Sequence, residues 1–91
     1  KVICWVDLDA DGFRILDRLR AVLPHVESRL MDRSIVEQFA NFATKGNGRE
    51  AQAVEHLCEG ELQCYYHLCQ NNLRIEQEHL PSEWILKALS I

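Results

Sequence analysis

The chain lacks any apolar run long enough to cross a bilayer, and its start does not have the form of a signal peptide. Only two prolines and four glycines occur in 91 residues, so no Pro- or Gly-rich linker divides the sequence. Internal repeats are absent too. These absences favour one small domain, residues 1–91, with no membrane association. At 47% hydrophobic and 26% charged residues, the composition is that of an ordinary globular protein.

Basic charge is also in short supply. Ten lysines and arginines face 14 aspartates and glutamates, which gives a formal net charge of −4. This is the wrong sign for a domain that grips nucleic acid by its own overall electrostatics. Any DNA binding would need basic surface from a longer parent protein, or metal ions to offset the acids. The chain begins at Lys1, without an initiator Met, and we expect it to be a piece of such a parent.

Closely spaced cysteine pairs are missing. Cys58, Cys64 and Cys69 are separated by five and four residues, whereas zinc sites use pairs such as C-x2-C. His56 and His67 lie in the same stretch, but the helical spacing favours core thiols over a zinc site. Nothing indicates a disulfide framework, so a reducing cytoplasm is the expected compartment.

The most informative stretch is residues 2–12, where an apolar, β-prone run ends in three acids and a glycine. Such runs are typical of sheet strands when a turn signal follows. Residues two apart on a strand point the same way, so Asp7 and Asp9 are predicted to converge. Two adjacent carboxylates repel each other unless a cation lies between them. Oxygen ligands suit Mg²⁺ or Mn²⁺, and Asp11 follows as a third candidate ligand.

Three other interpretations of these acids remain open. The Asp-x-Asp-x-Asp-Gly pattern opens the calcium loop of an EF-hand, but the loop's twelfth position here is Arg18 instead of Glu, and a strand-like run precedes it. The acids could instead cap the next helix, a role that suits Asp11 well. Asp7 could also be the nucleophile of a phosphoryl-transfer enzyme.

Residues 13–23 have a clear helical period that Pro24 ends. The opposite face is polar, and we interpret it as a solvated surface with i, i+3 ion pairs, in preference to a phosphate contact. That face carries Arg14, Asp17, Arg18 and Arg20.

The rest of the chain alternates between the two kinds of element. Ser34-x-x-Glu37 has the form of a capping box, and Gly60 is expected to interrupt a helical stretch. The order indicates an α/β fold with some parallel pairing. In sequence, we predict a strand over 26–31, a helix opened by Asp32 and Ser34, helices over 49–58 and 61–71, a short strand at the start of 73–80 and a helix from 82.

Two separated blocks of this sequence resemble a known family. Residues 5–20 resemble the acidic segment of a Toprim domain, in the form found in the C-terminal domain of the Wadjet JetD family, with Leu-Pro-His at 23–25 and Leu-Met-Asp at 30–32 following. Residues 74–78, Arg-Ile-Glu-Gln-Glu, are similar to that family's closing Arg-Leu-Glu-Gln-Glu block. His79 stands where the family often has Arg.

The resemblance implies a Toprim-like (Rossmann-like) sheet with flanking helices, as in the topoisomerase VI A subunit. It implies a Mg²⁺- or Mn²⁺-dependent endonuclease that hydrolyses DNA phosphodiesters in bacterial anti-plasmid defence. Through the parent protein, the implied partners are double-stranded DNA, subunits of an SMC-type complex and a second copy of the protein. By the same resemblance the catalytic residues would be Asp7, Asp9 and Glu76, with Asp11 and Glu78 as additional metal ligands.

One departure from the Toprim pattern affects the expected activity. Toprim sites also use a Glu from a strand upstream of the Asp-x-Asp strand, and no such residue precedes Lys1. The fragment could therefore be inactive alone, and a catalytically incomplete interaction module is the alternative function. Tyr65 and Tyr66 suggest covalent nucleophiles by analogy with topoisomerases, but their position among packing residues favours a structural role.

Overall fold

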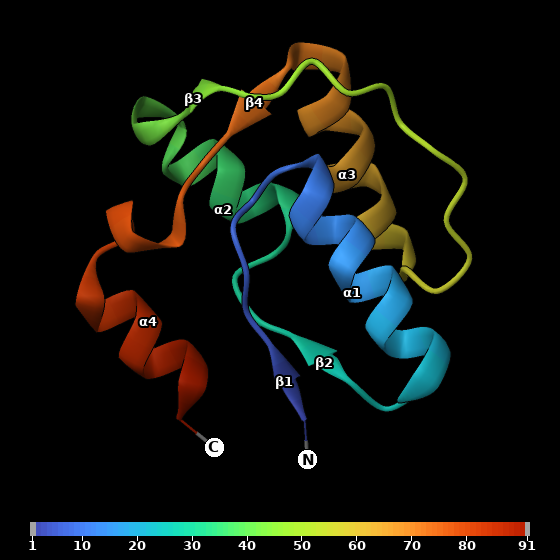
Figure 1. The fold of residues 1–91 in the computed structure, drawn as a ribbon. Coiled ribbons are helices and arrows are strands. Elements are labelled where there is room, and N and C mark those ends of the chain that lie inside the picture. Colours follow the sequence, from blue (N-terminus) through green and yellow to red (C-terminus); the bar gives the residue numbers. More distant parts are fainter. Residues whose placement is uncertain (1, 91) are drawn as a thin grey trace.

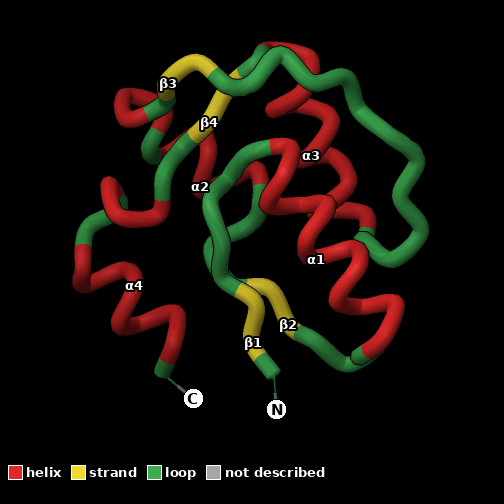
Figure 2. The backbone as a smooth tube through the Cα atoms, in the orientation of Figure 1, coloured by secondary structure: helices red, strands yellow, loops and turns green. Residues whose placement is uncertain are grey.

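A computed structural model describes residues 2–90 as a small mixed α/β arrangement (Figure 1). The helices are α1 (Ala10–Val22), α2 (Arg33–Gln38), α3 (Glu59–Asn71) and α4 (Ser82–Leu89), with 3-10 turns at Ala40–Phe42 and Gln77–His79. The strands are β1 (Ile3–Cys4), β2 (Glu27–Ser28), β3 (Thr44–Lys45) and β4 (Leu73–Arg74). Figure 2 shows how little of the chain the strands occupy and how much lies in connecting segments.

The strands pair in two small sheets. β1 and β2 are parallel, whereas β3 and β4 are antiparallel. The mixed α/β class and the expected parallel pairing are confirmed. A Toprim-like sheet is not, because the strands within residues 2–90 form only these two-stranded sheets.

Helix α1 begins earlier than its apolar period predicts, at Ala10 instead of residue 13. Asp9 is its N-cap, and the Asp9 side chain accepts a hydrogen bond from the backbone N–H of Gly12. The capping role expected of Asp11 therefore belongs to Asp9. A Cβ at Gly12 would lie 2.1 Å from the Asp7 carbonyl oxygen, so only glycine lets the first turn pack this closely on the preceding segment.

The core lies between the first segment and three helices. α1 and α2 both pack against α3, and the segment after β4 closes the core from a distant part of the chain (Figure 1). Burial of such aliphatic and aromatic side chains contributes about 1.5–3 kcal/mol each. The most deeply buried include Leu8, Phe13, Leu16, Tyr65, Leu68 and Ile75.

An ion pair inside this core corrects the prediction for Arg20, which the helical pattern placed on a solvated face. Its guanidinium binds both carboxylate oxygens of Glu61 on α3, with Nη2 to Oε2 at 2.8 Å, and Ser28 donates to the same carboxylate. Burial opposes ionisation of Glu61, but hydrogen bonds from Arg20, Ser28 and Cys58 dominate and lower its pKa to about 2. The pair connects α1 to α3.

Near α2, the predicted strand is too long, whereas the predicted start of the helix is confirmed. The strand predicted over 26–31 covers only Glu27–Ser28, because Leu30 has a left-handed backbone with φ of 56° that ends the extended run. Asp32 and Ser34 do open α2. Asp32 is the N-cap, because its carboxylate accepts from the backbone N–H of Ile35, and Ser34 donates its hydroxyl to Asp32 instead of serving as the N-cap of a capping box.

The helix predicted over 49–58 does not form. Its backbone N–H groups bind side chains of other elements instead: Gln52 donates to the Tyr65 hydroxyl, and residues 55 and 56 both donate to Asp17. Among the described residues Asp17 makes no ion pair on α1, in contrast to the expectation, and its carboxylate accepts these backbone N–H groups instead. Gly60 does not interrupt a helix either, since it lies in the first turn of α3.

The short strand predicted at the start of 73–80 is confirmed as β4, although it covers only two residues. β4 ends at Arg74, one further bridge forms at Ile75, and the chain then turns into the 3-10 helix Gln77–His79. Glu76 and Glu78 therefore do not share a strand face. Within residues 2–90, no helix has both the length and the apolar character that a membrane crossing requires.

Candidate metal centre

The acidic first segment and the segment after β4 meet at one antiparallel bridge. The N–H of Leu8 donates to the carbonyl of Ile75 at 2.9 Å, and the N–H of Ile75 donates back at 3.0 Å. Both side chains are fully buried. Because successive side chains on an extended segment point to opposite faces, the residues flanking this pair point away from the core. The bridge thus brings the first acids beside the polar residues that flank Ile75.

Three carboxylates surround the guanidinium of Arg74. Its Nη2 lies 3.3 Å from Oδ2 of Asp7, and its Nε lies 3.4 Å from Oδ2 of Asp9. The same Nη2 is 3.7 Å from Oε1 of Glu76. Charge-assisted hydrogen bonds are usually about 2.7–2.9 Å long, and the buried Nε has no hydrogen-bond partner among residues 2–90. The acids therefore outnumber the cation between them and hold it loosely.

Backbone groups fix the orientation of the two aspartates. Oδ1 of Asp7 accepts from the N–H of Gln77 at 2.9 Å, and Oδ1 of Asp9 accepts from the N–H of Gly12 at 2.6 Å. In each residue the second oxygen remains for the shared cation position. Burial raises the pKa of Asp9, and the nearby carboxylate of Asp7 adds to this effect against the Gly12 N–H and Arg74.

A second group of ligand atoms adjoins this position. Glu76, Glu78 and His79 each offer one atom, and these atoms lie within 4.8 Å of one another. A hydrogen bond with Glu76, together with its negative charge, raises the pKa of Glu78. Glu76 belongs to both groups, so it connects the aspartates to the exposed pair. The 3-10 turn folds the chain back and so brings Glu76 and Glu78 close together, as alternation along the predicted strand would also have done.

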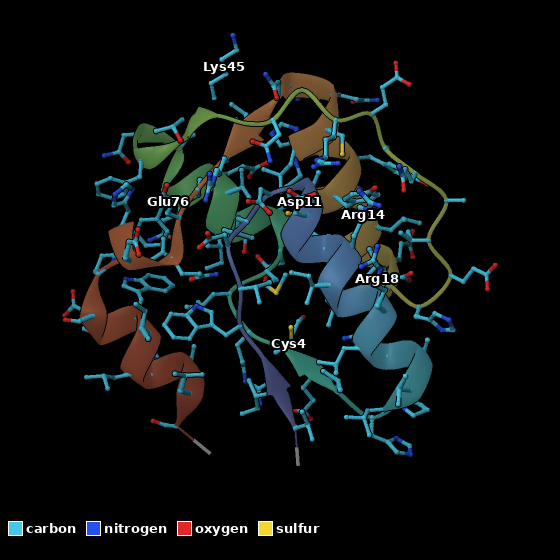
Figure 3. The ribbon with its side chains drawn as sticks, viewed as in Figure 1. Cys4, Asp11, Arg14, Arg18, Lys45 and Glu76 are labelled. Atoms are coloured by element: carbon cyan, nitrogen blue, oxygen red, sulfur yellow. The ribbon has the colours of Figure 1, made fainter. Side chains whose placement is uncertain are left out.

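Asp11 points into a different environment. Its carboxylate lies 3.1 Å from Nε of Arg49 and 3.9 Å from Nη1 of Arg14, and it accepts from Asn47. Figure 3 shows Asp11 at the start of α1, with Arg14 following along the helix. The structure therefore places Asp7, Asp9 and Glu76 around Arg74 and places Glu78 beside Glu76, whereas Asp11 contacts arginines. Among the described residues, the ligand atoms that lie within 4.8 Å of one another are those of Glu76, Glu78 and His79, without either aspartate.

Three residues of this region, Arg74, Gln77 and His79, are not among the predicted site residues. Arg74, which the sequence presents only as the first residue of the closing block, is the only described cation in an ion pair with Asp7, Asp9 or Glu76. Gln77 is buried, donates its side-chain amide to the Val6 carbonyl, and orients Asp7 through its N–H. The sequence carries no signal for this role, because the burial of Gln77, which requires partners for its amide, is visible only in the structure.

The thiols and tyrosines do not form a site within residues 2–90. No cysteine and histidine cluster is present there, and Cys64 is fully buried, which raises its thiol pKa to about 12. Tyr65 is buried and its hydroxyl accepts from the Gln52 N–H, in keeping with the structural role expected of it. Tyr66 lies on the surface.

The residues around Arg74 fit a divalent cation in charge and donor type. Asp7, Asp9 and Glu76 present three negative charges to one guanidinium, and every donor among them is a carboxylate oxygen, as Mg²⁺ and Mn²⁺ prefer. The loose contacts of Arg74 add to this fit, because its displacement would sacrifice only long, weak interactions.

Comparison with known proteins places the chain in a family. No curated protein matches the chain. The family model described as "Wadjet protein JetD, C-terminal" matches residues 1–89, which confirms the resemblance carried by the two acidic blocks. Membership suggests a role in Wadjet defence. Since the match spans nearly the whole sequence, the chain belongs to the JetD C-terminal domain family.

Proposed function

We propose that this chain supplies the acidic metal centre of a Toprim-type endonuclease that cleaves double-stranded DNA in Wadjet defence. The observation that carries the proposal is the convergence of Asp7, Asp9 and Glu76 on a single cation position. The family match supports the setting, in a parent protein that works with SMC-type subunits and with a second copy of itself.

Each residue has a defined part in this function. Asp7 and Asp9 hold the cation from one side, oriented by Gln77 and Gly12, and Glu76 closes the site with Glu78 beside it. A bound divalent ion would supply Lewis-acid polarisation of a phosphodiester and activation of water. The chain need not provide a nucleophile of its own, which agrees with the buried state of Tyr65.

A Mn²⁺ titration of the 91-residue chain tests the centre directly. The double variant D7N/D9N removes both charges but keeps the oxygen that accepts from Gln77 and the cap on α1, since Asn caps helices as well as Asp. We expect Mn²⁺ to bind the unmutated 91-residue chain. The double variant should lose this binding while it retains its circular dichroism spectrum.

The matched control is E59Q, which removes an exposed acid from the first turn of α3, away from the centre. It should bind Mn²⁺ with the affinity of the unmutated 91-residue chain. Equal Mn²⁺ affinity in D7N/D9N and E59Q would contradict the metal centre. In the full-length protein, the same double variant should abolish Mn²⁺-dependent nicking of plasmid DNA.

The second candidate function is an interaction module without catalysis, and the position of Arg74 favours it. An arginine that permanently neutralises Asp7 and Asp9 would leave a structural cluster, as in many ion-pair networks. Exposed apolar side chains, including Leu86 at 70% and Val22 at 78%, offer surface for other parts of the protein. Absence of Mn²⁺ binding together with unchanged nicking in D7N/D9N would select this function.

A further inference from the structure

A hollow of about 300 Å³ lies beside the first half of α1, apart from the acidic centre. It is lined by Asp11, Arg14, Ile15, Arg18 and Arg49. Figure 3 shows Arg14 and Arg18 one after the other along α1, on the side that faces the extended segment before α3. The helical period by itself predicts only a solvated surface for these arginines.

The hollow carries a surplus of positive charge on a chain whose net charge is negative. Three guanidinium groups face one carboxylate there, whereas the whole chain has a formal charge of −4. Arg14 and Arg18 are four residues apart on a helix, a spacing at which like charges destabilise each other. Within residues 2–90, Arg18 has no ion-pair partner. An external anion would relieve this repulsion.

Arg49 is positioned here by a segment that is fixed although it forms neither helix nor strand. The N–H of Gly48 donates to the Asn72 side chain at 2.7 Å, and the N–H of Gln52 donates to the Tyr65 hydroxyl at 2.8 Å. Both anchors belong to α3 or its C-cap. The third arginine is thus brought to the pair on α1 by specific tertiary contacts.

The carboxylate of Asp11 already occupies part of the hollow. It contacts Arg49 at 3.1 Å and Arg14 at 3.9 Å and accepts from the side-chain amide of Asn47 at 3.1 Å. These groups therefore stabilise anionic oxygens at this place. The guanidinium of Arg18 remains for a further anion.

We infer that the hollow formed by Arg14, Arg18 and Arg49 binds a backbone phosphate of the DNA strand, and that Asp11 competes with this phosphate and is not a metal ligand. The inference rests on the proposed function, because it names a substrate contact for the same centre. With a rise of 1.5 Å per residue, Arg14 and Arg18 lie about 8 and 14 Å along α1 from Asp9. The hollow therefore reaches a phosphate a few nucleotides from the acids.

Binding of a short DNA duplex to the 91-residue chain, measured by fluorescence anisotropy in EDTA at low salt, tests this inference. EDTA removes any contribution of the metal centre, so the result is independent of whether Asp7 and Asp9 bind Mn²⁺. We expect R18Q and R49Q each to weaken binding several-fold and to lower the slope of log affinity against log salt by about 1. R18K should retain binding, because it keeps the charge.

The variant D11N should change affinity in the opposite direction. Loss of the competing carboxylate is expected to tighten DNA binding several-fold, with Mn²⁺ affinity unchanged. The matched control is R33Q, which removes an exposed arginine that pairs with Glu37 on α2.

Three results would overturn the inference. R18Q and R49Q could bind DNA like R33Q, or D11N could lose Mn²⁺ affinity without a gain in DNA affinity. Complete competition by inorganic phosphate at matched ionic strength would identify a free-anion site instead of a strand contact. Failure of the proposed metal centre would show separately, as unchanged Mn²⁺ binding in D7N/D9N.

Discussion

Arg20 and Arg74 each meet carboxylates from a distant part of the chain, but Arg20 faces one acid and Arg74 faces three. Arg20 and Glu61 form a two-pronged pair with Nη2 to Oε2 at 2.8 Å, and the Arg20 side chain is 14% exposed. The contacts of Arg74 are 3.3–3.7 Å long, and its side chain is 34% exposed. A one-to-one buried pair leaves no charge for another partner, whereas three acids around one loosely held arginine do.

The largest effect on stability is expected from E61Q, which breaks the buried ion pair between Arg20 and Glu61. Removal of one partner leaves the buried Arg20 uncompensated, so the free energy of unfolding should fall by about 3–5 kcal/mol. Urea unfolding measures this loss. E59Q, on the same helix but exposed, should cost less than about 1 kcal/mol. Equal losses of stability in E61Q and E59Q would show that the ion pair between Arg20 and Glu61 does not stabilise the fold.

Acidification should weaken the same pair. The pKa of Glu61 is about 2 in the folded chain, below its ordinary value, so its stabilisation is complete above the ordinary pKa and is lost as the pH falls toward 2. The lost contribution is about 3 kcal/mol. The difference in free energy of unfolding between the unmutated chain and E61Q should therefore decrease as the pH falls from 5 to 2. A difference independent of pH would refute the lowered pKa.

The variant G12A tests whether close backbone packing at Gly12 positions the carboxylates around Arg74. The added Cβ would clash with the Asp7 carbonyl, so we expect a loss of about 1–3 kcal/mol in stability and weaker Mn²⁺ binding. G60A is the matched control, since nothing lies within 4 Å of a Cβ there. It should stabilise α3 by about 0.5–1 kcal/mol. The comparison is made by thermal unfolding with and without Mn²⁺.

The smallest effect on stability is expected from R74Q, because the contacts of Arg74 are long and partly exposed. Mn²⁺ affinity should rise a few-fold, since the arginine competes with the metal for Asp7 and Asp9. R33Q again serves as the control, and isothermal titration calorimetry measures both. Weaker Mn²⁺ binding in R74Q would mean that the arginine holds the acids in place for the metal.

Much of the candidate centre follows from local sequence. The Asp-x-Asp spacing at 7 and 9 predicts two carboxylates on one side of an extended segment, and both do contact one guanidinium. The apolar periods at 13–23 and 61–71 predict helices, which form with boundaries shifted by a few residues. Periodicity succeeds here because one face of each helix packs on the core.

Other patterns in the local sequence do not predict the structure that forms. Side chains from distant elements can accept hydrogen bonds from the backbone N–H groups of a segment and so prevent the helix that its sequence favours. Residues 49–58 have helical propensity, but Asp17 and Tyr65 bind their N–H groups, and no helix forms. The helical period likewise could not show that Arg20 would find Glu61 across the core.

The sequence by itself determined which segments carry apolar faces and where the acids lie along the chain. Only the tertiary structure decided which charges meet. The bridge between Leu8 and Ile75 brings Asp7 and Asp9 to Arg74, and the anchored segment before α3 brings Arg49 to Asp11. The physical reason is that hydrophobic periodicity specifies burial of one face, whereas the partner of a charge depends on contacts between residues far apart in sequence.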